Sequence, residues 1–392
     1  SNYALAWSLE EDGVETQNGT IADLDVPAQQ TRTFTIPYDR SKITGKEVFL
    51  NIDFRLKNAE PLLTAGQVVA YAQLPVVTKQ ACEGDCSKLL AEGHGKKKMK
   101  LAAKKDNVIA VTTPNLTFKL DRTTGLISEY AYNGKSMLGE GGTLKPNFWR
   151  APTDNDMGAN LQKKFKVWKN PQMNLKNIDV KKDKKANTVT IVTSFDMPEV
   201  QGQMDITYLV FANTGAVKVT EDFKATEGAK VSDMFRFGML LQMPYSMEKS
   251  TYYGRGPIEN YSDRKDCMRI AIYNDDADNQ YFPYIRPQES GTKSDIRWWK
   301  QTDATGLGLQ VKSCAPFYAS ALHFDTEELD DGDEKEQRHS FDLKKSKFTN
   351  LFLDAAHMGV GGENSWGAWP LEKYRIHYGN KTFNFVLIPQ TK

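Results

Sequence analysis

The sequence contains few of the residues that build metal sites and disulfide frameworks. It has four cysteines and five histidines among 392 residues. Cys82 and Cys86 lie close together in the chain. Neither Cys267 nor Cys314 has a second ligand at zinc-type spacing, and no two histidines form a His-x-x-His pair. We therefore expect free thiols or one local disulfide, and no structural metal.

Charge of one sign and long apolar runs are also missing. Lys and Arg number 51 against 50 Asp and Glu, a formal net charge of +1, so no global basic field attracts nucleic acid or an anionic membrane. No apolar run reaches the roughly 18 residues of a membrane-spanning helix, and no signal peptide is visible. We expect a soluble protein that binds neither partner. We interpret Ser1 and Asn2 as an expression remnant in place of the native N-terminus, so these residues do not encode the localisation, cytoplasmic or periplasmic.

A third absence is the alternation of strands and helices that marks a (β/α)8 barrel. Such a barrel needs about 250 residues of that alternation. Here, short stretches of period-two hydrophobicity follow one another with turn residues between them. We therefore predict an all-β chain, long enough for two or three domains.

The first predicted domain covers residues 1–77. Residues 47–56 place Val48 and every second residue after it on one apolar face, which predicts a half-buried strand. Residues 31–36 show the same alternation. With further strands expected at 5–9 and 67–71, a β-sandwich of about 75 residues follows.

A lysine-rich linker is predicted over residues 78–106. Residues 87–105 carry many lysines and few large apolar side chains. Such a run is typical either of a basic patch for a partner or of a solvated linker, and we favour the solvated linker. It marks the boundary before the second domain.

The second predicted domain, residues 107–392, has the pattern of a large antiparallel β-sandwich. Leu116, Phe118 and Leu120 alternate in one predicted strand, and Asn133-Gly134 is a strong hairpin signal. At most one short helix is expected, near residues 160–169. The remaining predicted strands lie at 115–121, 126–132, 188–192, 205–211 and 216–220.

The most unusual stretch runs from residue 147 to residue 158. It places Asp154, Asn155 and Asp156 in a row between Pro152 and Gly158, a composition that favours turns over regular structure. Such a loop either caps its own backbone or holds a polar ligand. Three later segments are equally dense in glycine, aromatic and charged residues: 252–264, 285–298 and 357–366.

In this order and spacing, the four segments resemble the C-terminal portion of the large lac-type β-galactosidases of glycoside hydrolase family 2. The resemblance covers residues 107–389 and, more weakly, 3–73. It implies an immunoglobulin-like β-sandwich followed by a galactose-mutarotase-like β-supersandwich. It also implies that the two catalytic glutamates lie on a barrel upstream of this segment. Full-length relatives bind Mg²⁺ and Na⁺ mainly in that barrel, so no cofactor is expected here.

These implications predict a fragment of an enzyme without its reaction centre. Glycoside cleavage needs an acid and a second carboxylate about 5–10 Å apart, and no motif places such a pair. We expect the fragment alone to be inactive. Its partners would be a β-galactoside substrate, the upstream barrel of the same polypeptide and further copies in a homo-oligomer.

Two other functions remain open. A stand-alone carbohydrate-binding module would use the same sandwich and an aromatic platform. An aldose-1-epimerase-like enzyme would need a histidine acid beside a carboxylate base. His339 and His357 are the candidates in residue type, although their flanking sequence resembles the hydrolase.

The resemblance gives Trp366 the role of a substrate platform at the edge of the active site. An indole stacks on the C–H face of a pyranose and leaves the hydroxyl groups to polar neighbours. The alternative is that Trp366 packs against Trp369 or the core.

The resemblance also makes residues 150–158 an active-site loop. Arg150 is expected to pair with a carboxylate of Asp154 or Asp156, while Gly158 would be a hinge with positive φ. We expect Asp154, Asn155 and Asp156 to buttress the loop rather than to contact sugar.

A scaffold role is predicted for the charged residues of the two middle segments. Bidentate contacts between arginine and carboxylate side chains would pin loops across the sandwich. Glu289 and Arg297 are a further possible pair, and the acidic run 327–336 is expected to be a solvated loop. The scaffold residues of the first of these segments are Arg255, Glu259, Asp263 and Arg264.

Overall fold

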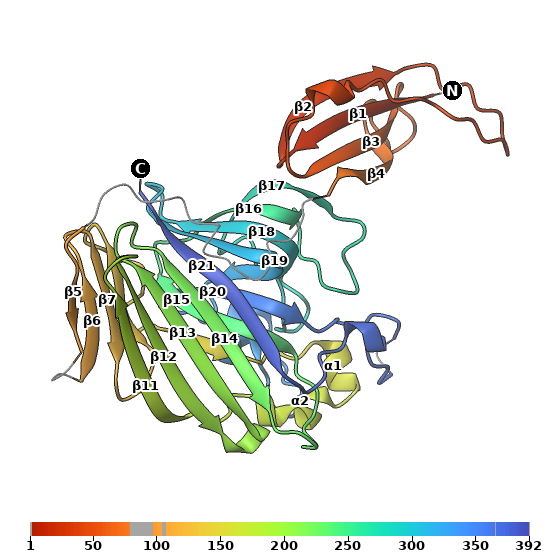
Figure 1. Ribbon diagram of the computed structural model, residues 1–392. Helices are drawn as coiled ribbons and strands as arrows, with labels where there is room; N and C mark the ends of the chain where they lie inside the picture. The colour runs from red at the N-terminus through yellow and green to blue at the C-terminus, as the bar shows by residue number, and fades with distance from the viewer. Residues whose placement is uncertain (1, 79–96, 104–106, 365, 392) are drawn as a thin grey trace. The chain divides into compact units, whose positions relative to one another are not determined.

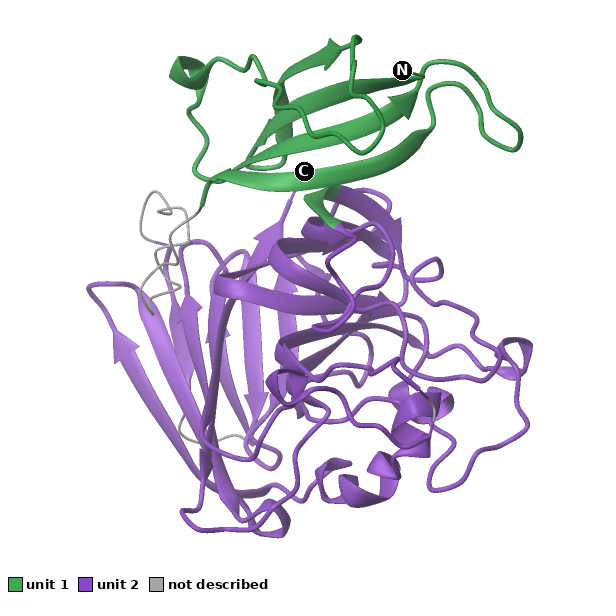
Figure 2. Cartoon of the chain, turned by 90° about the vertical axis from the view of Figure 1, so that its right-hand side faces the viewer, with its two compact units in different colours: residues 1–81, 269–272 green, residues 82–268, 273–392 purple. Residues whose placement is uncertain are grey.

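The computed structural model describes residues 2–78, 97–103, 107–364 and 366–391 (Figure 1). Cys82, Cys86 and most of the predicted linker lie outside the described residues. The chain divides into two compact units, coloured separately in Figure 2. Unit 1 comprises residues 1–81 with 269–272, and unit 2 comprises residues 82–268 with 273–392.

Unit 1 contains one antiparallel sheet with the strand order β2-β1-β3-β4. Leu5, Trp7 and Leu9 alternate along β1 and are buried with Val48 and Leu50 of β3. The strands predicted at 5–9, 47–56 and 67–71 are therefore confirmed. The strands are β1 (Tyr3–Glu11), β2 (Val14–Ile21), β3 (Val48–Leu56) and β4 (Val68–Val77).

The strand predicted at residues 31–36 is wrong. Residues 22–39 are described throughout and contain neither helix nor strand. Phe34 and Ile36 still pack against the core of unit 1. Two alternating side chains are thus partly buried, as in a strand, but the backbone makes no ladder with a neighbouring strand. One face of the four-stranded sheet is covered by this irregular segment.

Unit 2 is built from two antiparallel sheets. The smaller has the order β5-β6-β7-β8-β9, and its strands are β5 (Lys100–Ala102), β6 (Val108–Thr112), β7 (Leu116–Asp121), β8 (Ile127–Tyr132) and β9 (Lys135–Ser136). Lys100 to Ala102 therefore form a strand inside the range predicted as linker. Leu116, Phe118 and Leu120 are all buried, and Asn133 and Gly134 both have positive φ, as a tight hairpin requires.

The larger sheet of unit 2 follows the order β10-β15-β20-β19-β21-β14-β13-β12-β11, with β16, β17 and β18 joined beside β19 (Figure 1). The strands are β10 (Leu144–Asn147), β11 (Asn174–Asp183), β12 (Thr188–Met197), β13 (Gly202–Phe211), β14 (Val217–Ala225), β15 (Arg236–Pro244), β16 (Lys249–Gly256), β17 (Arg269–Asp276), β18 (Lys293–Thr302), β19 (Gly308–Leu322), β20 (Phe348–His357) and β21 (Lys381–Gln390).

The two sheets of unit 2 share one apolar core. Phe118 of β7 lies with its ring 5.9 Å from Tyr208 of β13, and Tyr130 of β8 donates a hydrogen bond to the carbonyl of Gly215 at 2.8 Å. A single cluster of buried residues extends from β6 to β21. The all-β class predicted from periodicity is confirmed.

Helices are few and short in the described part of the chain. The helix predicted near residues 160–169 is present in two pieces, α2 (Leu161–Lys164) and the 3-10 turn Lys166–Trp168. The others are α1 (Asp154–Gly158) and α3 (Thr326–Leu329), with further 3-10 turns at Arg40–Lys42, Pro198–Val200, Ser340–Asp342 and Glu372–Tyr374. Of these helices, none is long and apolar enough to cross a membrane.

Candidate functional site

The unusual stretch at 147–158 folds into a capped helix rather than an open loop. The Thr153 hydroxyl accepts a hydrogen bond from the Asp156 backbone N–H at 3.1 Å, and the Asp156 carboxylate accepts one from the Thr153 N–H at 2.9 Å. This capping box starts α1, and acidic residues in a first turn also suit the helix dipole. Our expectation of irregular structure holds for residues 148–153 but is wrong for residues 154–158, because Asp and Asn favour first helical turns as well as loops.

Arg150 anchors this helix to the end of β20. Its guanidinium contacts the Asp156 carboxylate twice, Nε to Oδ2 at 3.0 Å and Nη2 to Oδ1 at 2.7 Å. It also donates to the carbonyl oxygens of Met358 at 2.7 Å and Gly359 at 3.0 Å. The Arg150 and Asp156 side chains are almost completely buried. The predicted pairing is therefore present, and it ties two distant segments together.

Asp154 and Asn155 lie at the exposed side of α1. The Asp154 carboxylate lies 3.2 Å from Arg286 and 3.1 Å from Lys335. Partial burial raises the pKa of Asp154, but the hydrogen bond from Lys335 and the charge of Arg286 outweigh this and lower it. Asn155 donates its side-chain N–H to the carbonyl of Val360 at 3.1 Å.

Trp366 is almost completely exposed to solvent. Its side chain is 93% exposed, so the alternative in which it packs against Trp369 or the core is wrong. Trp369 instead packs edge-on against Phe165 at 5.6 Å. Gly158, predicted as a hinge with positive φ, is the last residue of α1 and has no positive φ.

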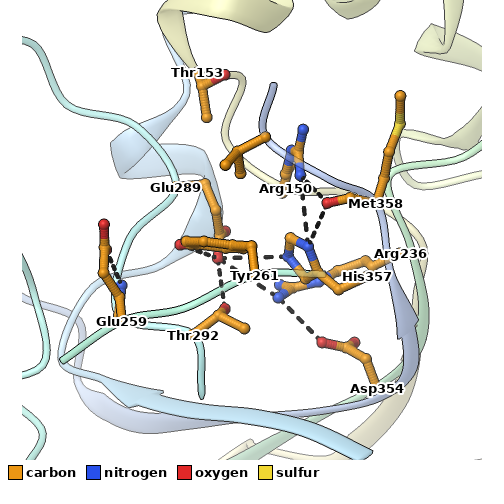
Figure 3. Close-up of polar contacts among 12 residues, drawn as sticks. Arg150, Thr153, Arg236, Glu259, Tyr261, Glu289, Thr292, Asp354, His357 and Met358 are labelled. Carbon is orange, nitrogen blue, oxygen red and sulfur yellow. Dashed lines mark hydrogen bonds and ion pairs between the residues drawn. The ribbon is translucent and has the colours of Figure 1, made fainter. Parts of the chain in front are cut away.

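A buried polar network lies beneath α1 (Figure 3). Glu289 Oε1 accepts a hydrogen bond from the Thr292 hydroxyl at 2.8 Å and lies 3.6 Å from His357 Nε2. Arg236 Nη2 lies 3.7 Å from the same oxygen and 3.1 Å from an oxygen of Asp354. Four ionisable side chains from two strands and a loop thus form one cluster.

The ionisable groups of this cluster are shifted in opposite directions. Burial raises the pKa of Glu289, but the charge of Arg236 and the contact with His357 hold it at about 2. Burial lowers the pKa of His357 to about 4. Burial raises the pKa of Asp354 to about 7, although Arg236 opposes the shift. At neutral pH, Glu289 is charged and His357 is neutral.

The predicted pair of Glu289 with Arg297 is wrong. Arg297 instead donates a hydrogen bond to the Asp295 carbonyl at 2.5 Å. Arg236 and Asp354, which neighbour Glu289 and each other, lie outside the segments that the sequence singled out. Only His357 was considered, as a candidate acid for the epimerase alternative, and the structure places it rather than His339 beside a carboxylate.

A pocket of about 380 Å³ opens between α1, the loop after β20 and the network. We refer to it as the central pocket. Glu289 and Tyr261 line it from the network, and Asp154 and Asn155 line it from α1. Carboxylates, amides and aromatic rings together suit an uncharged ligand with many hydroxyl groups. Its lining residues are Thr153, Asp154, Asn155, Glu259, Tyr261, Arg264, Tyr284, Gln288, Glu289, Val360, Gly361 and Gly362.

Charged pairs surround the central pocket as the scaffold prediction expected. Arg264 contacts Glu259 at 2.5 Å, and Arg255 contacts Asp295 at 2.5 Å. The Glu259 carboxylate also accepts hydrogen bonds from the Tyr284 hydroxyl and from the Gly291 N–H. These contacts join the loop after β16 to the segment before β18.

The acidic run 327–336 is only in part the solvated loop that we predicted, since residues 333–336 are exposed but two of its carboxylates are buried. The Asp330 carboxylate accepts a hydrogen bond from the Trp149 indole at 2.8 Å, and its side chain is 1% exposed. Asp331 is equally buried, between Arg286 at 2.5 Å and Arg338 at 2.7 Å. The high density of acidic residues in the sequence did not indicate which of their carboxylates are buried and paired. Nowhere in the described ranges do three or more His, Cys, Asp or Glu side chains gather as a metal site.

Comparison with known proteins places most of the chain in one family. Residues 112–387 match the sequence model described as "Beta galactosidase small chain", and residues 1–77 match "Beta-galactosidase, domain 4". A β-galactosidase of Priestia megaterium is 27% identical over 390 residues, which is 99% of this chain and 36% of that protein. One of Lactobacillus delbrueckii subsp. bulgaricus is 28% identical, covering 94% of this chain and 34% of its own length. The chain spans about a third of these relatives.

Two solved structures show a weak similarity to this chain. A putative aldose 1-epimerase from Escherichia coli K12 has a TM-score of 0.39 and 8% identity, covering 75% of this chain and 100% of its own. A galactose mutarotase related enzyme from Lactobacillus acidophilus has a TM-score of 0.39 and 8% identity, covering 72% of this chain and 97% of its own.

Proposed function

The chain belongs to the β-galactosidase small chain family, and from this premise we propose that it is the C-terminal part of a β-galactosidase that hydrolyses terminal β-D-galactosides. Its role there is to complete the substrate pocket, while an upstream barrel of the same polypeptide supplies the catalytic carboxylates. The relatives' much greater length supports this division, because they have room for such a barrel.

The exposure of Trp366 is the observation that carries the proposal. An indole that is 93% exposed costs solvation free energy unless a ligand or partner covers it. Trp366 follows a segment that lines the central pocket at Val360, Gly361 and Gly362. We propose that this connection brings the indole to the mouth of the pocket, where a sugar ring would meet an aromatic face beside carboxylate and amide groups.

The α1 segment supports the pocket in two different ways. The Asp156–Arg150 pair is buried, which supports a buttress role. Asp154 and Asn155, which the sequence analysis also expected to be buttresses, line the pocket, and we propose that they contact its ligand. Their contacts to Arg286 and to Val360 hold them in place for that role.

Replacement of Trp366 by alanine in the full-length enzyme tests the proposal. We expect KM for nitrophenyl β-galactoside to rise about tenfold, since an aromatic stacking contact contributes on the order of 1 kcal/mol beyond the apolar area it buries. The matched control is Phe341→Ala, which removes another exposed aromatic ring, 85% exposed, outside the pocket. An unchanged KM in the Trp366 variant would remove the platform role.

A further inference from the structure

Trp366 has an exposed side chain, so the backbone on either side of it must fix its position. We infer that Asp263 is a positioning residue for Trp366, a role that rests on the proposed function of the tryptophan as a sugar platform. Asp263 lies in the loop after β16, far from Trp366 in the sequence. Its contacts reach the segment that leaves β20 and leads to the tryptophan.

The Asp263 carboxylate holds two consecutive backbone N–H groups of that segment. Its Oδ1 accepts a hydrogen bond from Val360 N at 3.0 Å, and its Oδ2 accepts one from Gly361 N at 2.8 Å. Hydrogen bonds from N–H groups to a charged carboxylate are stronger than those to a neutral acceptor. One side chain therefore fixes both the position and the direction of this backbone.

Close packing strengthens this contact. A Cβ atom added at Gly359 would lie 2.5 Å from Asp263 Oδ2, so the backbone passes the carboxylate at a distance that only glycine allows. Asp263 itself sits in a tight turn in which Tyr261 and Arg264 exchange backbone hydrogen bonds at 3.2 and 2.9 Å. The carboxylate is thus presented from a fixed backbone.

The remaining polar groups of this short segment are held by other partners. Met358 N donates to the Phe235 carbonyl at 2.8 Å, and Gly359 N donates to the Tyr374 carbonyl at 2.9 Å. Arg150 binds the carbonyls of Met358 and Gly359, and Asn155 binds that of Val360. Asp263 supplies two of the anchors on the N-terminal side of Trp366.

Beyond these anchors, two glycines with positive φ lead toward Trp366, and Gly367 directly after it passes close to the backbone of Gly158. Gly361 has φ of 72° and Gly362 has φ of 126°, and the Trp366 N–H donates to the Asn364 side chain at 2.9 Å. With its ring in solvent, Trp366 depends on the anchored backbone for its position. A platform fixed before ligand arrives avoids the entropy cost of ordering it on binding.

The test uses Asp263→Asn, which keeps the side-chain shape. The amide nitrogen cannot accept a hydrogen bond, so one of the two backbone N–H groups loses its acceptor. In the full-length enzyme we expect KM for nitrophenyl β-galactoside to rise about threefold to tenfold, with kcat changed less. In the 392-residue chain, we expect faster amide hydrogen exchange at Val360 and Gly361.

A double variant separates positioning from general damage. If Asp263 acts through the tryptophan, adding Asp263→Asn to Trp366→Ala should raise KM no further. The matched control is Asp183→Asn, since the Asp183 carboxylate also accepts two backbone N–H groups, from Lys185 at 2.8 Å and Ala186 at 2.9 Å, in the turn between β11 and β12. That variant should leave KM unchanged.

Each outcome decides the inference. Unchanged amide exchange at Val360 and Gly361 would overturn it. So would an Asp263→Asn KM equal to wild type when Trp366→Ala raises KM, or additive effects in the double variant. If Trp366→Ala itself leaves KM unchanged, the proposed platform fails, and faster exchange in Asp263→Asn would then show an anchor without a positioning role.

Discussion

One guanidinium serves two buried carboxylates in the network below the central pocket. Arg236 lies between Glu289 and Asp354, and all three side chains are at least nine-tenths buried. Burying a charge is costly unless it is paired, and a single cation cannot fully compensate two anions. The carboxylates therefore divide: the pKa of Glu289 is about 2, whereas that of Asp354 is about 7.

This division predicts a pH dependence of stability that Asp354→Asn would change. The folded state binds a proton at Asp354 up to about pH 7, whereas the unfolded state loses it near its ordinary pKa of 3.8. Between these values the folded state holds more protons, so Asp354 makes the free energy of unfolding fall as pH rises.

The Asp354→Asn variant lacks this titration. We therefore expect its free energy of unfolding, relative to that of wild type, to increase as the pH rises from about 4 to about 7. The slope of the difference is at most about 1.4 kcal/mol per pH unit. The pKa of His357 is lowered to about 4, so this residue makes the free energy of unfolding rise with pH up to about pH 6.5. Because His357 is present in both proteins, its contribution largely cancels when their free energies of unfolding are subtracted. Urea unfolding of both proteins at pH 4, 5.5 and 7 measures this difference in the free energy of unfolding. A difference that stays constant with pH would contradict the raised pKa of Asp354.

At the scale of elements, α1 depends on its cap because it is only five residues long. An isolated helix of this length is unstable in water, so its N-cap and its tertiary contacts must hold it. Thr153 supplies the cap, and Asp156 supplies both the reciprocal hydrogen bond and the ion pair with Arg150.

Thr153→Ala should therefore lower the free energy of unfolding by about 1 kcal/mol, the usual cost of losing an N-cap hydroxyl. Thr153→Ser is the matched control, because it keeps the hydroxyl and should retain most of the stability. Chemical denaturation of both variants measures the effect. Equal stability of the alanine variant and wild type would show that the Arg150–Asp156 contact alone holds α1.

Elements with local pairing were the ones that the sequence predicted well. In β7 and β8, alternation and the Asn133-Gly134 turn specify the same hairpin, so the prediction matches its strands within one residue at each end. Residues 31–36 alternate equally well but have no strand to pair with, and sequence periodicity contains no information about a partner. For α1, the same Asp and Asn residues suit both a turn and a capped helix. The reciprocal hydrogen bonds between Thr153 and Asp156 favour the helix.

The four segments that the sequence singled out line the central pocket together, but side-chain pairings were predicted only between sequence neighbours. Arg150 and Asp156 are six residues apart, and their pairing was expected. The partners of Glu289 come from β15 and from the end of β20, and the register between these strands brings Arg236 opposite His357. Strand order and register are properties of the assembled sheet, so no spacing in the sequence showed this cluster.

At the scale of the whole molecule, the family and the central pocket predict a chain that cannot cleave glycosides alone. Cleavage needs a general acid, a carboxyl group whose pKa is raised toward neutrality. Asp154 and Glu289 line the pocket, and the pKa of each is lowered. Glu259, the third carboxylate, is bound by Arg264 and Tyr284. The raised pKa of Asp354 belongs to a side chain with no exposed surface.

We therefore expect the 392-residue chain, even at high concentration, to release no nitrophenol from nitrophenyl β-galactoside. Turnover that Trp366→Ala abolishes would place a catalytic pair within these residues and contradict the proposed division between this part and a barrel. Polarimetry on the same protein distinguishes the alternatives. Faster interconversion of α- and β-galactose, lost in Glu289→Gln, would assign the Glu289–His357 contact an epimerase role. Saturable galactoside affinity without either reaction would instead favour a carbohydrate-binding module, because the exposed indole and the central pocket would then suffice to bind sugar.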